Sequence, residues 1–341
     1  MKSKALRAPV TENNKSEYAL SCITRAARQA AGSGPACAAV ELFLRTGNSH
    51  LSRSSRYSLE GIKKERVHSD LCKTALWNLF EALSAQLPAA EKNVAAVMPE
   101  MIREKVKPMV TGLVQEEWRE TALRELGNRV FVLNAAGARK AIEAELTTSW
   151  LHEAWNVFWL FFSDHGLRPE AVRRPVFEGI TAGTFAHISR SAYERDDGTS
   201  DVIVHEAAHL LHYLKPENYG LPIKRGQVRF LDVRFIDREL FAYTCEAYTK
   251  LLEKGRVPAL KSTEKIWEIC GHYPHSKSLV KEIAALLLKA AKARNGWKVI
   301  RERTIEKRGR VWRKQQLHDA LFAISDTNAA AEGQTPSRGE N

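Results

Sequence analysis

The sequence predicts an α+β fold that is mostly helical, with a small sheet in the middle of the chain. Long stretches have apolar residues at helical spacing, whereas two short runs in the middle of the chain, 130–134 and 184–191, are typical of strands. The chain has 341 residues, of which 44% are hydrophobic and 27% are charged. This composition is typical of a globular protein with a substantial core, and it excludes a chain that is disordered throughout.

Helical patterns dominate the first part of the chain. Two helices are expected within residues 16–45, on either side of the Gly-Ser-Gly-Pro breaker at 32–35. Apolar residues at helical spacing predict further helices at 70–86, 90–105 and 114–126. We therefore expect a helical N-terminal region over residues 1–110, to which the sequence assigns no chemistry.

The middle of the chain changes character. After a strand at 130–134 we expect a long helix over 138–164, a second strand at 184–191 and another helix at 202–214. The long helix carries Trp150, Trp155 and Trp159, whose spacings of five and four residues do not place them on one narrow face. These tryptophans are therefore expected in a hydrophobic core rather than on a surface that stacks a ligand.

The helix at 202–214 contains an HExxH motif formed by His205, Glu206 and His209. Residues four apart lie on the same face of a helix, so the two imidazoles can bind one zinc ion. Glu206 lies one step round the helix and can take a proton from a water molecule bound to that metal. The motif therefore indicates a metal site with the chemistry of hydrolysis.

A second His-Glu pair allows an internal comparison. His152 and Glu153 are adjacent, but Asn156 stands where the second histidine would be. We therefore expect this pair on a helix surface, without a metal.

A catalytic zinc site normally has three protein ligands. The candidates for the third ligand are His212, His272, His275 and a downstream carboxylate. His212 lies about 10 Å along the helix axis from His205, too far for both to reach one ion. A helix predicted at 237–253 carries Glu239, which follows His209 by 30 residues after a turn-rich segment. That separation lets the chain reverse and place the second helix beside the first.

The stretch from Thr184 to Glu253 resembles the gluzincin family of zinc metallopeptidases. The resemblance rests on the HExxH motif, on the uncharged residues around its ligands, and on the Glu-Leu-Phe-Ala run that begins at Glu239. It implies a zincin-like catalytic core with a small sheet and an active-site helix. It also implies that the strand at 184–191 is an edge strand that binds a peptide substrate by backbone pairing.

The resemblance also implies roles for individual residues. Zinc would be bound by His205, His209 and Glu239, with Glu206 as the general base. In gluzincins an acidic residue often follows the ligand glutamate by four positions and supports a ligand histidine, whereas here that position is Tyr243. Either the Tyr243 hydroxyl takes an analogous role, or one of two acidic residues on the same helix, Asp237 and Glu246, does so.

A peptidase of this type also needs a donor that stabilises the developing oxyanion. Tyr243 and Tyr219 are candidates between which the residues do not choose, and Tyr243 is the one we assign. His272 and His275 could also line the cleft.

The C-terminal part of the chain is strongly basic. Residues 289–314 contain eleven Lys or Arg and two Glu, with Trp297 and Trp312 among them. Within a segment at 289–325, the runs 297–305 and 310–315 suggest a two-stranded ribbon, and a helix is expected after them. Basic residues interleaved with aromatic ones could contact nucleic acid through phosphates and stacking. Residues 326–341 have little to bury and are expected to form a disordered tail.

The net charge of +12 is concentrated at the two ends of the chain. Residues 1–110 carry 17 basic and 10 acidic groups, residues 289–341 carry 12 and 6, and residues 111–288 carry 23 and 24. The metallopeptidase-like domain expected at 111–288 is thus close to neutral. An anionic partner is expected at the flanks rather than in the cleft.

The N-terminus, the apolar stretches and the cysteines indicate the cellular compartment in which the protein is expected. The basic N-terminus lacks the apolar run of a secretory signal, and the most apolar stretch, 154–162, is far shorter than the roughly 20 residues of a membrane helix. The five cysteines are odd in number and form no CxxC pair, which argues against a disulfide framework and a cysteine zinc site. We expect a cytoplasmic protein without a membrane span, with signal-independent export left open.

Together these patterns predict a cytoplasmic, zinc-dependent endopeptidase that acts on a peptide or protein substrate. One alternative is a regulator in which a metallopeptidase-like core is joined to nucleic-acid binding, as in the ImmA/IrrE group, whose Glu-x-x-Ala pattern is loosely matched by Glu239 and Ala242. The other is a non-catalytic scaffold with a fortuitous HExxH motif. The sequence predicts neither the substrate sequence nor the oligomeric state.

Overall fold

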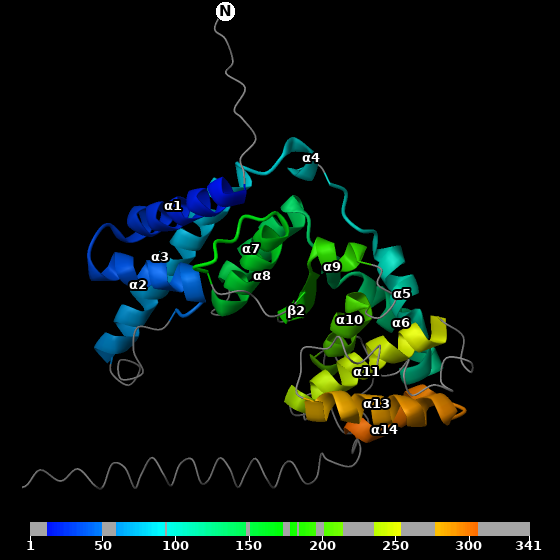
Figure 1. Cartoon of the computed structure of the whole chain (residues 1–341). Coiled ribbons are helices and arrows are strands. Elements are labelled where there is room, and N and C mark those ends of the chain that lie inside the picture. Colours follow the sequence, from blue (N-terminus) through cyan, green and yellow to red (C-terminus); the bar gives the residue numbers. More distant parts are fainter. Residues whose placement is uncertain are drawn as a thin grey trace, which may run out of the picture. The chain divides into compact units, whose positions relative to one another are not determined.

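The computed structural model describes residues 12–49, 59–92, 94–147, 151–172, 178–182, 184–195, 201–213, 235–253 and 277–305. Over these residues the chain is mostly helical and has one three-stranded sheet (Figure 1). The predicted fold class, α+β and mostly helical, is confirmed. No helix in the described part of the chain is both long enough and apolar enough to cross a bilayer.

Contacts within the chain divide it into two compact units. The first comprises Met1–Lys107 and Leu123–Leu210, and the second comprises Pro108–Ala122 and Leu211–Asn341. The division expected from the sequence, with boundaries at 110 and 288, stays a prediction.

The first unit begins with three helices that pack against one another, α1 (Glu12–Ala31), α2 (Pro35–Thr46) and α3 (Leu59–Ser84). Gly34 has a φ of 89° and precedes Pro35, which occupies the first turn of α2. Gly47 ends α2 in the left-handed conformation, with a φ of 75°, and its N–H donates to the carbonyl of Phe43 at 2.7 Å. The predicted pair of helices around the Gly-Ser-Gly-Pro breaker is therefore confirmed. The helices that follow are α4 (Ala89–Lys92), α5 (Pro99–Leu113) and α6 (Glu116–Gly127).

The single long helix predicted at 138–164 is wrong, because two helices occupy this region. They are α7 (Ala135–Thr147) and α8 (Leu151–Asp164), and they pack against each other. The side chain of Asn134 accepts a hydrogen bond from the N–H of Gly137 at 2.7 Å, so Gly137 lies in the first turn of α7 instead of preceding the helix. At the other end, the Thr147 hydroxyl donates to the carbonyl of Ala144 at 2.6 Å, a local bond that competes with helix continuation.

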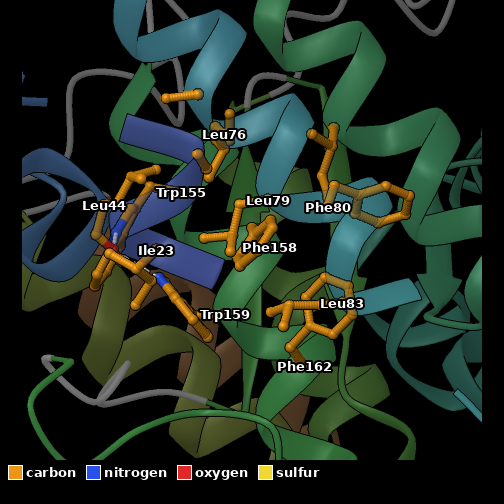
Figure 2. Close-up of a cluster of buried hydrophobic side chains, with 14 of the residues drawn as sticks. Ile23, Leu44, Leu76, Leu79, Phe80, Leu83, Trp155, Phe158, Trp159 and Phe162 are labelled. Carbon is orange, nitrogen blue, oxygen red and sulfur yellow. Dashed lines mark hydrogen bonds between the residues drawn. The ribbon is translucent and has the colours of Figure 1, made fainter. Parts of the chain in front are cut away.

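Helix α8 supplies the centre of a hydrophobic core. Its side chains Trp155, Phe158, Trp159 and Phe162 are buried and lie among apolar residues of α1, α2 and α3 (Figure 2). The indole N–H groups of Trp155 and Trp159 both donate to the carbonyl of Leu44, at 2.9 and 3.1 Å. The prediction that these two tryptophans belong to the core is confirmed, and Trp150 lies outside the described residues.

The sheet consists of β1 (Val130–Val132), β2 (Gly179–Ala182) and β3 (Phe185–Ile188), in the order β1-β3-β2. Strand β3 pairs parallel with β1 and antiparallel with β2. The strand predicted at 184–191 is therefore central, and the expectation that it forms a substrate-binding edge is wrong. Its last residues instead enter the short helix α9 (Arg190–Glu194), where the Ser189 hydroxyl accepts from the N–H of Ala192 at 3.2 Å.

The second unit contains three helices that pack pairwise, α11 (Phe235–Glu253), α13 (Lys277–Lys292) and α14 (Gly296–Ile305). The basic ribbon predicted from 297–305 is wrong, because this run is helix α14. The Asn295 side chain accepts from the N–H of Lys298 at 3.1 Å and so caps the helix. Trp297 and Ile300 are three residues apart and both buried, which is helical spacing. The second half of the predicted ribbon and the predicted tail lie outside the described residues.

Candidate metal centre

The HExxH motif lies on α10 (Val202–Tyr213), so the helix predicted at 202–214 is confirmed. Asp201 begins this helix: its Oδ1 accepts from the N–H of Val204 at 3.2 Å, and its carboxylate is 3.2 Å from Nζ of Lys105. An N-cap residue fixes the first turn of a helix. Asp201 therefore helps to place His205, the first histidine of the motif. The sequence patterns did not single out Asp201.

His205 and His209 form the first part of the candidate centre. Both side chains are buried, each with a relative exposure of 8%. Their Nε2 atoms lie 3.1 Å apart, and the planes of the two rings are 77° apart. Two nitrogens bound tetrahedrally to one zinc ion at 2.0–2.1 Å are separated by about 3.3 Å. The histidine pair therefore has nearly the separation that a shared metal ion requires.

Glu239 on α11 is the third potential ligand in the structure, in agreement with what the resemblance to gluzincins implied. The ligand atoms of His205, His209 and Glu239 all lie within 4.8 Å of one another, and all three residues are buried. Two imidazole nitrogens and a carboxylate oxygen are a donor set found in catalytic zinc sites. Burial of a carboxylate is costly unless a positive charge or hydrogen bonds compensate it, and a bound cation would provide that charge. These three residues could thus hold a metal ion.

Glu206 is 4% exposed and contacts strand β2. The Thr181 hydroxyl donates to Oε2 of Glu206 at 2.7 Å. A Cβ atom at Gly179 would lie 2.7 Å from Cγ and 2.8 Å from Oε1 of Glu206, so only glycine fits here without displacement. Neither Gly179 nor Thr181 was identified from the sequence as a residue of the site. The one available signal was a glycine next to an Ile-Thr pair, which is typical of a strand that another group approaches closely.

Of the other candidate site residues, some lie in the part of the chain that the structure describes and others lie outside it. On α11, Tyr243 follows Glu239 by one turn and is partly buried, whereas Asp237 and Glu246 are buried. Tyr219, His272 and His275 lie outside the described residues, as does the side chain of His212.

In the second His-Glu pair, His152 lies on the surface as predicted, whereas Glu153 is half-buried. His152 is exposed; its Nδ1 lies 3.3 Å from the carbonyl of Gly47, and its ring stacks on Trp155 with centroids 5.9 Å apart. Four of the five cysteines, Cys22, Cys37, Cys72 and Cys245, are buried and free, and Cys270 is outside the described residues.

No protein family, curated protein or solved structure matches the chain. The case for a metal centre therefore depends on the geometry and chemistry of the residues themselves.

Proposed function

We propose that the protein is a zinc-dependent peptidase of the gluzincin type. The observation that carries the proposal is the buried group His205, His209 and Glu239, with Glu206 adjacent to the first ligand. Three protein ligands leave one position of a tetrahedral zinc ion for water, which is the arrangement of catalytic rather than structural zinc sites. When bound, zinc would polarise both this water and the carbonyl of the scissile peptide bond.

The residues of the chain then perform the proton transfers. Glu206 accepts a proton from the attacking water and passes it to the leaving nitrogen, as a general base and then a general acid. Tyr243 is proposed as the donor that stabilises the developing oxyanion, because it lies one turn from Glu239 on α11.

Strand β2, rather than β3, is proposed to bind the substrate backbone. The N–H of Ser189 donates to the carbonyl of Glu178, and hydrogen-bonded pairs alternate along an antiparallel ladder. The backbone groups of Gly179 and Thr181 therefore point away from β3, at an edge of the sheet where no other strand of the described residues pairs. An extended peptide could add to this edge beside Glu206.

The decisive experiment compares Glu206→Gln with Glu153→Gln, the glutamate of the His-Glu pair that lacks metal ligands. Zinc content, thermal midpoint and hydrolysis of a quenched fluorescent peptide library would be measured on the full-length chain. Glu206→Gln should keep zinc and fold but lose about 10²–10⁴-fold in turnover, the usual contribution of a general base. Glu153→Gln should retain turnover. Full activity of Glu206→Gln, or a wild-type protein that takes up no zinc, would contradict the proposal.

Exposed basic side chains support a second candidate function, nucleic-acid binding. They lie on α13, on α14 and on the turn that joins them: Lys281, Lys289, Lys292, Arg294 and Lys298. Phosphate contacts of this kind weaken steeply with salt. Binding of a labelled DNA or RNA duplex that is insensitive to salt, or absent at 50 mM salt, would argue against this function.

A further inference from the structure

We propose that Thr181 is the positioning residue for Glu206: its hydroxyl holds the carboxylate in the orientation in which it meets the attacking water. The inference rests on the proposed function and adds to it a residue outside the HExxH motif. Thr181 acts through Glu206 and does not touch the reacting atoms.

The hydrogen bond between the two residues is short and comes from a rigid donor. Oγ1 of Thr181 lies 2.7 Å from Oε2 of Glu206, within the range for a hydroxyl that donates to a carboxylate. A threonine side chain has few accessible χ1 rotamers. The backbone of Thr181 is held as well, because strand β2 pairs with the central strand β3 on both sides of the position where Thr181 lies opposite Ala186.

The neighbouring glycine locates the second carboxylate oxygen. Oε1 of Glu206 would lie 2.8 Å from a Cβ atom at Gly179, so this oxygen rests directly over the glycine. Gly179 and Thr181 are two residues apart and therefore face the same side of β2. One strand thus constrains both oxygens of Glu206, Oε2 by a hydrogen bond and Oε1 by close contact.

This constraint has a kinetic consequence. A glutamate side chain has three rotatable torsions, and Glu206 must present one oxygen to a water whose place is set by the metal. A misplacement of about 1 Å at a reacting group costs on the order of 10²-fold in rate. Loss of the Thr181 hydroxyl should therefore lower turnover while leaving the zinc ligands in place.

The test compares Thr181→Val with Thr181→Ser in the full-length, zinc-loaded protein. Valine keeps the shape and β-branching of threonine but cannot donate, whereas serine keeps the hydroxyl. Turnover and KM on one quenched fluorescent peptide that the wild type cleaves, zinc affinity, and a crystal structure of Thr181→Val would be determined. We expect Thr181→Val to lose about 10–100-fold in kcat with KM and zinc affinity within about threefold, and Thr181→Ser to stay within about threefold in kcat.

The outcomes separate this inference from the proposed function. If the wild type cleaves peptides and Glu206→Gln does not, but Thr181→Val turns over like the wild type, the positioning role is overturned and the peptidase stands. If the wild type has no peptidase activity, the proposed function fails. The crystal structure then decides the positioning role alone: a displaced Glu206 carboxylate in Thr181→Val supports it, and an unmoved one overturns it.

Discussion

The Nε2 atoms of His205 and His209 lie 3.1 Å apart on successive turns of α10. Without a metal ion, such a contact requires that the N–H of one ring donates a hydrogen bond to the nitrogen of the other. A metal ion replaces that proton and accepts a lone pair from both rings, so the same geometry serves a bound cation. This relationship leads to the first prediction.

The wild-type protein is expected to bind one equivalent of zinc, and His209→Ala is expected to weaken zinc binding by more than about 100-fold. Removal of a supporting partner outside the ligand set already costs 10–100-fold, so loss of a ligand should cost more. Competition with a chromogenic chelator would measure the affinity. His152→Ala is the control, because its imidazole belongs to the pair without a second histidine. Equal zinc affinities for the two variants would show that His209 is no ligand.

The sequence, through its resemblance to gluzincins, predicted the three candidate ligands but not the strand beside Glu206, for physical reasons. The His205–His209 spacing is a local property of a helix, and α11 has a clear helical pattern around Glu239. Strand β2 has four residues, and its conformation depends on pairing with β3, which no local pattern encodes. The sequence could identify β3 as a strand, but not that partners cover both of its edges.

The basic run at 297–305 illustrates a different failure. Its Trp and Ile residues were interpreted as strand formers, although Trp297 and Ile300 have helical spacing. The long helix predicted at 138–164 failed because a continuous apolar pattern hid the break between α7 and α8. Strand pairing depends on contacts between separate segments, whereas the caps that Asn134 and Asn295 provide are local bonds that the apolar pattern does not reveal.

Glu145 on α7 and Glu153 on α8 give a prediction about pH. Their side chains share a hydrogen bond, burial raises the pKa of both, and the pKa of Glu153 rises to about 7. The folded protein therefore binds more protons than the unfolded chain between the ordinary carboxyl pKa and about 7. Stability should be full in acid and fall as the pH rises through that window.

The Glu153→Gln variant mimics the protonated carboxyl group and should remove this dependence. Its thermal midpoint should exceed that of the wild type by a few degrees at pH 8 and match it at pH 4.5. Glu143→Gln, on the exposed face of α7, is the matched control. A wild-type midpoint that is flat or rises between pH 5 and 7, with Glu153→Gln following it, would contradict the prediction.

The contributions of Trp155 and Trp159 to stability should be coupled, because both side chains donate to the carbonyl of Leu44. This carbonyl lies in the last turn of α2, where no helical N–H is available to it, and it accepts from both Trp155 and Trp159. Each single Trp→Phe variant leaves the carbonyl one partner and should cost about 1–2 kcal/mol of unfolding free energy. The double variant leaves it buried without an indole donor and should cost about 1 kcal/mol more than the sum of the singles. Urea unfolding of the four proteins measures this, and strict additivity would show that the two bonds are independent.

The cap of α10 gives a prediction about local stability. Asp201→Ala removes the acceptor for the N–H of Val204 and should destabilise the protein by about 1–2 kcal/mol. Asp201→Asn keeps an acceptor and loses the ion pair with Lys105, which is 45% exposed, so its cost should stay below about 1 kcal/mol. Chemical denaturation compares the two. Equal losses for the two variants would mean that the ion pair, which both of them remove, dominates over the cap.

Gly112 of α5 gives a prediction about packing in the second unit. A methyl group at this position would overlap the Cβ, Cγ and Cδ1 atoms of Trp297 on α14. Because Trp297 is 6% exposed and its ring packs edge-on against Tyr248 at 4.8 Å, it has little room to move. Gly112→Ala should therefore cost about 1–3 kcal/mol, although alanine favours a helix more than glycine does.

Gly112→Ala in a protein that lacks the Trp297 ring shows whether the clash with this ring causes the loss of stability. In a Trp297→Ala protein the two atoms nearest the new methyl group, Cγ and Cδ1, are absent, so Gly112→Ala should cost much less than in the wild type. The exposed neighbour Thr111→Ala serves as the control for a simple change in helix propensity. Urea unfolding would give the four free energies of the cycle. If Gly112→Ala costs the same in both backgrounds, its effect comes from the backbone of α5 and not from contact with Trp297.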